Sequence, residues 1–390
     1  MLNSKLLVLS LMLINFNLLA SEFPMGDAKK SWGVRVDNLD EQFKLKLGTR
    51  IQAIAKNTVV TDSNDDKESF TDFYIRRMRL MLEIKYTEGW KFYADIRNDD
   101  VSKADKGEQD FNIGDAYLEK KINDHMKLRL LRAKVDVSRT ETVSSARILF
   151  LNRASIADHA AQYVSHNRRA ANAQILGKLG NKAHYQLVIG DGVYSGKFFD
   201  SQDNTPDKVI KQNAMIGGKI RVSPIKGMEE SKLREAYFGK EQVFSFGFGA
   251  FNTSNITIDN GTNQFDTNRT LYNAEVTYHN NALTILAEAF RFDGEFYDLT
   301  SSDRIGSSSG YVIQGEYCLE SYYAPFMRVE SWNRFDQADD MTQKSFVLGI
   351  NRYLKGEKFR YGFFYTKDEY DKNIGDETAE SVQVTLMMNY

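Results

Sequence analysis

The sequence predicts an all-β protein, a 16-stranded antiparallel transmembrane β-barrel with its third loop folded inward, and three observations support this prediction. Segments of alternating apolar and polar residues recur from residue 43 onward, and most are about ten to fifteen residues long, against about five or six in soluble sheets. Short turns and long polar loops alternate between these segments, as in outer-membrane barrels. After residue 20 no run of eighteen apolar residues occurs, so only a closed barrel could carry the chain through lipid.

The composition is that of an ordered β protein. The chain of 390 residues has a net charge of −2, a mean hydropathy of −0.47, 20 Tyr, 25 Phe and 4 Pro, which suits aromatic-rich strands with little disorder. The near-neutral charge argues against a nucleic-acid-binding protein. The single cysteine, Cys318, excludes an intramolecular disulfide framework and a cysteine-based zinc cluster. We expect no cofactor, no metal ion and no nucleic-acid partner.

The N-terminus predicts export. Lys5, the apolar run from Leu6 to Leu19 and the small Ala20 predict a signal peptide over residues 1–20 that is cleaved after Ala20. An uncleaved anchor helix is the alternative, but the run is shorter than the about 20 apolar residues that span a bilayer. We therefore expect a polar lead over residues 21–42, a barrel over residues 43–390, and a location in the outer membrane of a Gram-negative bacterium, in contact with its lipid.

The first predicted strand has one apolar and one basic face. Over residues 43–56 the apolar positions alternate with polar positions that include Lys44, Lys46 and Arg50. A period of two over this length predicts a strand with its polar side toward the lumen. Soluble sandwiches also alternate, so the strand lengths and connections carry more weight than this pattern.

The second predicted strand, residues 72–87, contains a pair of adjacent arginines. The parity of its positions puts Arg77 and Arg79 on the polar face. The same parity predicts that Tyr74 and Arg76 lie on the opposite, apolar face.

Turn signals fix the predicted strand count. Short turns are expected at residues 87–89, 123–124, 180–182, 280–281, 320–321 and 355–357. Longer connections are expected near residues 57–69, 100–110, 138–169, 192–211, 255–268, 294–308, 333–341 and 368–378. These hairpins give sixteen strands with long loops at one end. One connection is irregular, because residues 224–241 should form a short turn and are too many for one.

The C-terminus reads as a closing strand. Val382, Val384, Leu386, Met388 and Tyr390 occupy every second position up to the terminal aromatic residue. In bacterial barrels such a strand is the usual signal for outer-membrane insertion. The alternative is an amphipathic edge strand of a soluble fold, which would leave an apolar edge prone to aggregation.

Positive charge is concentrated between residues 127 and 169. This stretch has three acids, Asp136, Glu141 and Asp158, against nine basic residues, Lys127, Arg129, Arg132, Lys134, Arg139, Arg147, Arg153, Arg168 and Arg169. It begins as a strand and then loses its alternation for about thirty residues, a length that suggests a functional loop. We expect this pore loop, about residues 138–169, to fold into the lumen and to select anions.

Arginine and lysine supply the chemistry that an anion pore needs, since they replace hydration by charge-assisted hydrogen bonds. The predicted constriction consists of the loop residues Arg139, Arg147, Arg153, Arg168 and Arg169, and Arg129 and Lys134 also belong to the predicted anion-binding set. The predicted ladder of weak sites along the strand faces consists of Lys44, Lys46, Arg50, Arg77, Arg79 and Arg97. Several weak sites in series let an ion enter and leave. The alternative is a solvated lumen wall balanced by Glu83, Asp95, Asp99, Asp115 and Glu119.

Catalytic and metal sites have little support. Ser155, Asp158 and His159 contain the residue types of a hydrolase triad, but sequence neighbours rarely supply its geometry. His159 and His166 are too far apart for a helical metal pair and lack a third ligand. We expect no catalytic residues and no metal site.

Three motifs resemble the phosphate-selective porin O and P family. They are Phe-Tyr-Ile-Arg-Arg-Met-Arg-Leu at residues 73–80, Glu-Gly-Trp-Lys-Phe-Tyr-Ala-Asp at 88–95 and Asp-Ala-Tyr-Leu-Glu at 115–119. Residues 43–52 and 349–351 look like further strands of the same family. The resemblance implies a sixteen-stranded trimeric porin whose third loop folds into the pore and which passes phosphate or other anions by diffusion.

One position departs from that family. Family members commonly carry Lys-x-Pro where the chain enters the pore loop, whereas this chain has Lys134, Val135 and Asp136. A carboxylate beside an anion site lowers the local positive potential. The sequence therefore predicts an anion filter without specifying which anion it prefers.

The sequence thus predicts an outer-membrane diffusion porin, anion-selective and not an enzyme, that forms a homotrimer and passes phosphate or similar small anions. A general or weakly cation-selective porin is the alternative within this class. An outer-membrane hydrolase and a secreted binding protein are the alternatives from other classes.

Overall fold

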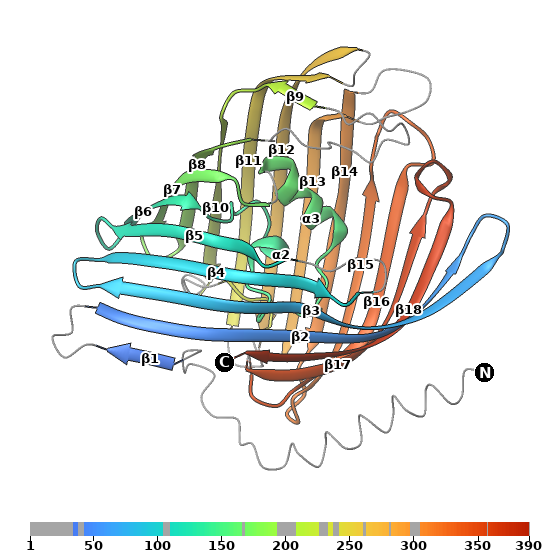
Figure 1. Cartoon of the computed structure of the whole chain (residues 1–390), viewed down its shortest axis with the longest axis horizontal. Coiled ribbons are helices and arrows are strands. Elements are labelled where there is room, and N and C mark those ends of the chain that lie inside the picture. Colours follow the sequence, from blue (N-terminus) through green and yellow to red (C-terminus); the bar gives the residue numbers. More distant parts are fainter. Residues whose placement is uncertain are drawn as a thin grey trace.

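Sixteen antiparallel strands close into a barrel in the computed structural model (Figure 1). The structure describes residues 34–37, 43–103, 110–165, 168–192, 208–225, 233–236, 242–259, 263–280, 282–296, 305–356 and 358–389. The predicted signal peptide, most of the lead, His166 and Tyr390 lie outside these described residues. Within the described ranges, no helix has the length and apolar composition needed to cross a membrane.

The strands of the barrel follow one another around the ring. They are β2 (Phe43–Thr61), β3 (Lys67–Tyr86), β4 (Trp90–Val101), β5 (Asn112–Lys121), β6 (Met126–Arg132), β7 (Ala171–Leu179), β8 (Ala183–Gly190), β10 (Met215–Ile225), β11 (Gln242–Asp259), β12 (Gln264–Asn280), β13 (Leu283–Phe296), β14 (Ile305–Tyr317), β15 (Tyr323–Asn333), β16 (Thr342–Tyr353), β17 (Phe359–Tyr370) and β18 (Glu377–Asn389). Strand β18 pairs with β2 and closes the ring. Two short strands pair beside the ring, β1 (Val34–Asp37) on β2 and β9 (Lys208–Lys211) on β11.

The predicted strand number is therefore confirmed, and short turns alternate with longer connections as expected. Several strands are longer than predicted, since β2 and β3 have 19 and 20 residues and β11 has 18. The β11–β12 connection shrinks accordingly to residues 260–263. The alternation continues past Asn255, where Ile256 and Ile258 are fully buried.

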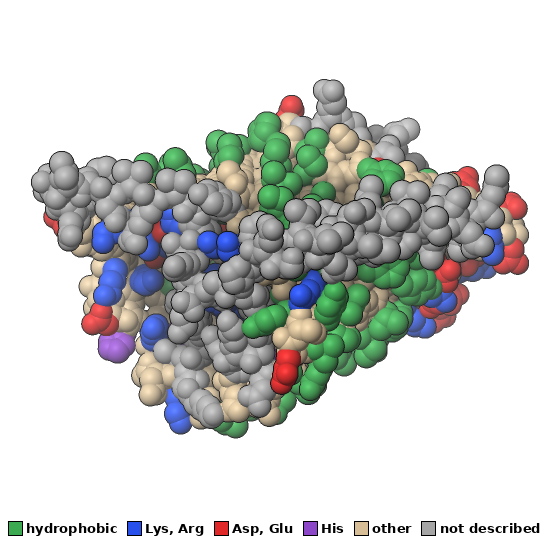
Figure 2. Space-filling model, turned by 90° about the horizontal axis from the view of Figure 1, so that it is seen from below, with side chains coloured by type: hydrophobic (Ala, Val, Ile, Leu, Met, Phe, Trp, Pro, Cys, Tyr) green, Lys and Arg blue, Asp and Glu red, His purple; other side chains and the backbone are tan. Residues whose placement is uncertain are grey.

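The wall of the barrel is apolar outside and polar inside, the reverse of a soluble sheet. On β12, Tyr272 and Val276 are 41% and 44% exposed on the outer face, whereas Asn273 and Glu275 are buried on the inner face. Figure 2 shows hydrophobic side chains gathered in broad patches on the outer surface. This arrangement is that of a barrel with lipid outside and a polar lumen.

The β6–β7 connection, residues 133–170 and called L3 from here on, folds into the lumen, as predicted for the third loop. It contains α2 (Arg139–Thr142) and α3 (Ser155–Val164), which lie inside the ring of strands (Figure 1). The apolar face of α3, with Ile156 and Ala160, packs in one core with Phe251 and Phe292 of the wall. L3 is thereby attached to the β11–β15 side of the barrel.

A β-bulge in β3 corrects the prediction for the paired arginines. The register against β2 shifts between Gln52 and Ala53, so that Arg76 is an extra residue in β3. A bulge reverses the inward and outward parity of the residues before it. Tyr74 is therefore buried at 7% exposure, and the prediction that Tyr74 and Arg76 lie on the outer face is wrong.

Candidate functional site

The bulge directs both adjacent arginines of β3 at L3. Arg76 donates from Nε to Oδ1 of Asn152 at 2.9 Å, and Arg77 donates from Nη1 to the carbonyl oxygen of Leu151 at 2.6 Å. Arg77 also donates to Oε1 of Gln52 at 2.9 Å. The two guanidinium groups therefore bridge the barrel wall and the loop that crosses the lumen.

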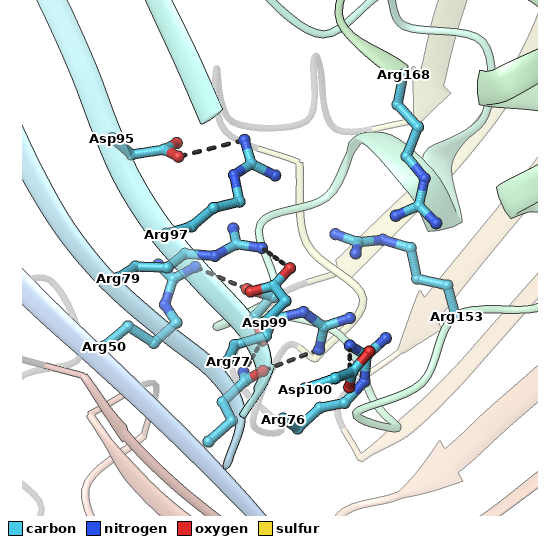
Figure 3. Close-up of polar contacts among 12 residues, drawn as sticks. Arg50, Arg76, Arg77, Arg79, Asp95, Arg97, Asp99, Asp100, Arg153 and Arg168 are labelled. Carbon is cyan, nitrogen blue, oxygen red and sulfur yellow. Dashed lines mark hydrogen bonds and ion pairs between the residues drawn. The ribbon is translucent and has the colours of Figure 1, made fainter. Parts of the chain in front are cut away.

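Further arginines line the same side of the wall. Arg79 lies 3.5 Å from Asp99, and Arg97 lies 3.3 Å from Asp95. Arg50 of β2 donates to Oγ of Ser145 in L3 at 2.8 Å. Figure 3 shows this set projecting from the wall into a space that, on the other side, is bordered by Arg153 and Arg168.

The L3 arginines complete a basic cluster. Arg153 lies 3.0 Å from Oε2 of Glu141, and Arg169 lies 2.7 Å from Oδ1 of Asp115. Burial lowers the pKa of Arg153; Glu141 opposes this effect, while the guanidinium groups of Arg168, Arg79 and Arg169 add to it. Wall and loop cations therefore repel one another across this space, and an anion placed between them would relieve the repulsion.

A cavity of about 310 Å³ lies at this place, and we call it the filter cavity. Its lining consists of Arg76, Arg77, Asn152, Arg153, Ser155, Asp158, His159, Gln162, Arg168 and Trp332. Four guanidinium groups from two opposed elements thus face one carboxylate, and that carboxylate, Asp158, is ion-paired with Arg168.

The structure brings Arg50, Arg77, Arg79, Arg97, Arg153, Arg168 and Arg169 of the predicted set together around the lumen. Sequence reasoning missed Arg76, which would be found only by treating the arginine pair as a bulge.

Other predicted residues lie in different surroundings. Arg129 donates to Oε2 of Glu119 at 2.7 Å on the β5–β6 wall. Arg139 is 1% exposed, and its Nε lies 3.6 Å from Glu275. Lys44 and Lys46 lie opposite Lys85 and Glu83, where β2 begins and β3 ends.

Lys134 and Arg147 complete the predicted set. The Lys134 amino group lies 2.9 Å from Oε1 of Glu141, and burial lowers the pKa of Lys134 well below its ordinary value. The carbonyl oxygen of Arg147 accepts hydrogen bonds from the backbone of Glu235 and Ala236. Lys134 therefore joins two parts of L3, and the Arg147 backbone joins L3 to the β10–β11 connection.

Asp136, the departure from the family pattern, anchors L3. Its carboxylate is bound at both oxygens by Arg221 of β10, with 2.6 Å between Oδ1 and Nη2. Burial by itself raises the pKa of Asp136, but the Arg221 guanidinium outweighs burial and holds that pKa below its usual value. Its backbone N–H donates to Gln186 at 2.9 Å, a bond that a proline could not make. The Asp136 carboxylate is thus neutralised by Arg221, and its side chain is not among those lining the filter cavity.

Three buried carboxylates hold the L3 backbone. Glu288 of β13 accepts from the N–H groups of Arg139 and Thr140 at 3.0 and 2.7 Å. Glu330 of β15 accepts from the N–H of Ile156 at 2.7 Å and so caps α3, whose N-cap residue has no capping side chain. Glu235 accepts from the N–H of Leu149 at 2.8 Å.

Ser155, Asp158 and His159 of α3 are the residue types of a hydrolase triad, but each contacts a residue outside this set. His159 lies 3.1 Å from Glu295, Asp158 pairs with Arg168, and the Ser155 hydroxyl accepts from Gln343 at 3.3 Å. Each side chain therefore has a separate partner, so no nucleophile and base are paired. Among the described residues no group of three His, Cys, Asp or Glu is arranged to hold a metal ion.

Comparisons with known proteins agree with this architecture. The phosphate-selective porin O and P family matches residues 45–390. An uncharacterised protein of Aquifex aeolicus (strain VF5) is 24% identical over 381 residues, which covers 87% of this chain and 86% of the relative.

Solved porin structures share the fold. An anion-selective porin from Comamonas acidovorans has a TM-score of 0.59 at 11% identity, over 90% of this chain and 100% of that one. OprB of Pseudomonas putida has a TM-score of 0.60 at 10% identity, over 90% and 95% of the two chains. The family and the fold are those of an outer-membrane channel. The chain belongs to the phosphate-selective porin O and P family.

Proposed function

We propose that the filter cavity and the arginines beside it select small anions, phosphate among them, as these diffuse through the barrel. The observation that carries this proposal is the convergence of Arg76 and Arg77 from the wall with Arg153 and Arg168 from L3 on one cavity. Guanidinium groups in a site partly shielded from water attract anions more strongly than the same groups on an open surface.

The neighbouring acids set the strength of binding. Asp95, Asp99 and Asp100 lie beside the arginines of β3 and β4 at 3.3, 3.5 and 2.8 Å. These pairs weaken each local site, and a series of weak sites allows an ion to leave again. A weakly cation-selective porin is the second candidate, because the same acids line the wall; their pairing with arginine favours the anion proposal.

We also propose that the chain assembles as a homotrimer after cleavage of the segment 1–20, with outer-membrane lipid around it. The homotrimer rests on family analogy, and the cleavage on the charge and apolar pattern of residues 1–20.

Phosphate should compete with chloride for the filter. In a planar bilayer with chloride as the current carrier, millimolar phosphate should reduce the single-channel current, because a multivalent oxyanion accepts more charge-assisted hydrogen bonds than chloride. The reduction should weaken in Arg168→Gln and stay unchanged in Lys344→Gln, whose side chain lies on the outer face of β16. An unreduced chloride current would reject phosphate as a preferred solute.

A further inference from the structure

The connection between β10 and β11 reaches L3 inside the barrel. It stands where an outer-membrane barrel has a short periplasmic turn, yet its described part, residues 233–236, contacts the middle of L3. The N–H groups of Glu235 and Ala236 both donate to the carbonyl oxygen of Arg147 at 3.1 Å. In return, the N–H of Leu149 donates to Oε2 of Glu235 at 2.8 Å. These three bonds join the two segments in both directions.

The contact is buried as well as hydrogen-bonded. Glu235 and Ala236 are each 1% exposed. Ala236 belongs to one apolar core with Leu149 and Phe150 of L3 and with wall residues that include Phe326. Withdrawal of residues 233–236 would expose this core and leave the L3 backbone groups without partners, so the segment favours one position of L3.

We propose that residues 233–236 are a strut that positions the pore loop from the periplasmic side, and that Glu235 is its positioning residue. The inference rests on the proposed function, because the strut acts through L3 residues 147–153, which end at Arg153 of the filter cavity. Together with the carboxylates Glu288 and Glu330, which also hold the L3 backbone, the strut would keep the L3 arginines facing the arginines of β3.

The strut also makes the position of L3 sensitive to pH. Burial raises the pKa of Glu235 to about 7 from an ordinary value of 4.5; the N–H of Leu149 opposes this, Glu288 adds to it, and Arg153 and Arg328 oppose it. Arg139 also lies beside the segment and donates to the carbonyl oxygen of Arg234. The other charged or titratable groups around it are Glu316, Cys318 and Tyr353, the last two in the shared core.

The sign of the effect follows from the raised pKa. The docked strut binds the Glu235 proton more tightly than an exposed carboxyl would, so docking is favoured at low pH. That advantage is lost as pH rises through about 7, where the buried carboxyl ionises. L3 should therefore become less firmly held above neutrality.

The test is the open-channel current noise of the full-length protein in a planar bilayer, from about pH 5.5 to about pH 8.5. The wild-type noise should rise with a midpoint near 7, the pKa of Glu235. Glu235→Gln keeps an acceptor for the N–H of Leu149 but cannot ionise, so its noise should stay low and flat. Glu320→Gln removes an exposed carboxylate from a neighbouring turn and should retain the wild-type profile.

Two outcomes would overturn the strut. Glu235→Gln could show the wild-type midpoint, which would mean that a group other than Glu235 causes the change. Alternatively, Glu235→Ala could be as quiet as the wild type at every pH, which would mean that the acceptor does not hold L3. In both cases the channel would still prefer anions at about pH 6. If the proposed function itself were wrong, the channel would show no anion preference at that pH.

Discussion

Arg79→Glu should lower the ratio of chloride to potassium permeability by at least about tenfold, because a unit charge at about 6 Å shifts the energy of an ion by roughly 0.7 to 3 kcal/mol, depending on the dielectric. The substitution changes two units of charge and acts in opposite directions on anions and cations. Arg79 has a single carboxylate partner within 4 Å among the described residues, Asp99 at 3.5 Å, so its loss leaves few groups unpaired. The reversal potential under a KCl gradient measures the effect.

Lys344→Glu is the matched control for that experiment. It makes the same change of charge on the outer face of β16, since its neighbours Gln343 and Ser345 are the buried, inward residues. Its reversal potential should equal that of the wild type. If Arg79→Glu and Lys344→Glu shift the potential equally, the inner arginines are not the filter.

Glu288→Ala should release the start of L3. The Glu288 carboxylate accepts from the N–H groups of Arg139 and Thr140 and from the Thr140 hydroxyl, at 3.0, 2.7 and 2.5 Å. Each of the three buried donors left without a partner costs about 1–3 kcal/mol, so the loop should lose about 3–9 kcal/mol of its attachment. We expect larger, noisier single-channel currents with weaker anion preference.

Glu288→Gln separates the loss of bonds from the loss of charge. Its amide oxygen can still accept from one backbone N–H, so its currents should lie between those of the wild type and Glu288→Ala. Heat-modifiable migration on gels should remain in both variants, because the sixteen-strand ring does not include these bonds. A normal, quiet channel in Glu288→Ala would show that Glu288 does not anchor L3.

The barrel was predictable because its signals are local. A period of two, short turns such as residues 87–89 and the closing strand to Met388 depend only on neighbours in sequence, and they predict the strand number. The inward loop was predicted from the length and basic charge of residues 138–169 and from the family resemblance. The ends of β11 and β12 differ from the predicted connection at residues 255–268 because polar residues such as Asn255 and Asp266 resemble a loop in sequence. Within the barrel, the Thr257 hydroxyl instead donates to Oδ1 of Asp266 on the paired strand at 2.6 Å.

The filter was predictable only in part because ion pairing depends on distant strands. Arg139 and Arg153 look alike in sequence, but Glu275 of β12 and Ser245 of β11 lie beside Arg139, whereas Arg153 borders the filter cavity. The role of Asp136 likewise depends on Arg221, 85 positions away. The turn toward L3 at Arg76 depends on a bulge that parity cannot reveal.

The most direct test of an arginine filter is the reversal potential of the wild-type channel in a planar bilayer under a KCl gradient. The structure predicts a potential of the sign that chloride flux produces, because Arg76, Arg77, Arg153 and Arg168 converge on one cavity. It also predicts that this potential moves toward zero as the salt concentration rises and screens these charges. A potential of the opposite sign, showing a preference for potassium, would contradict the account.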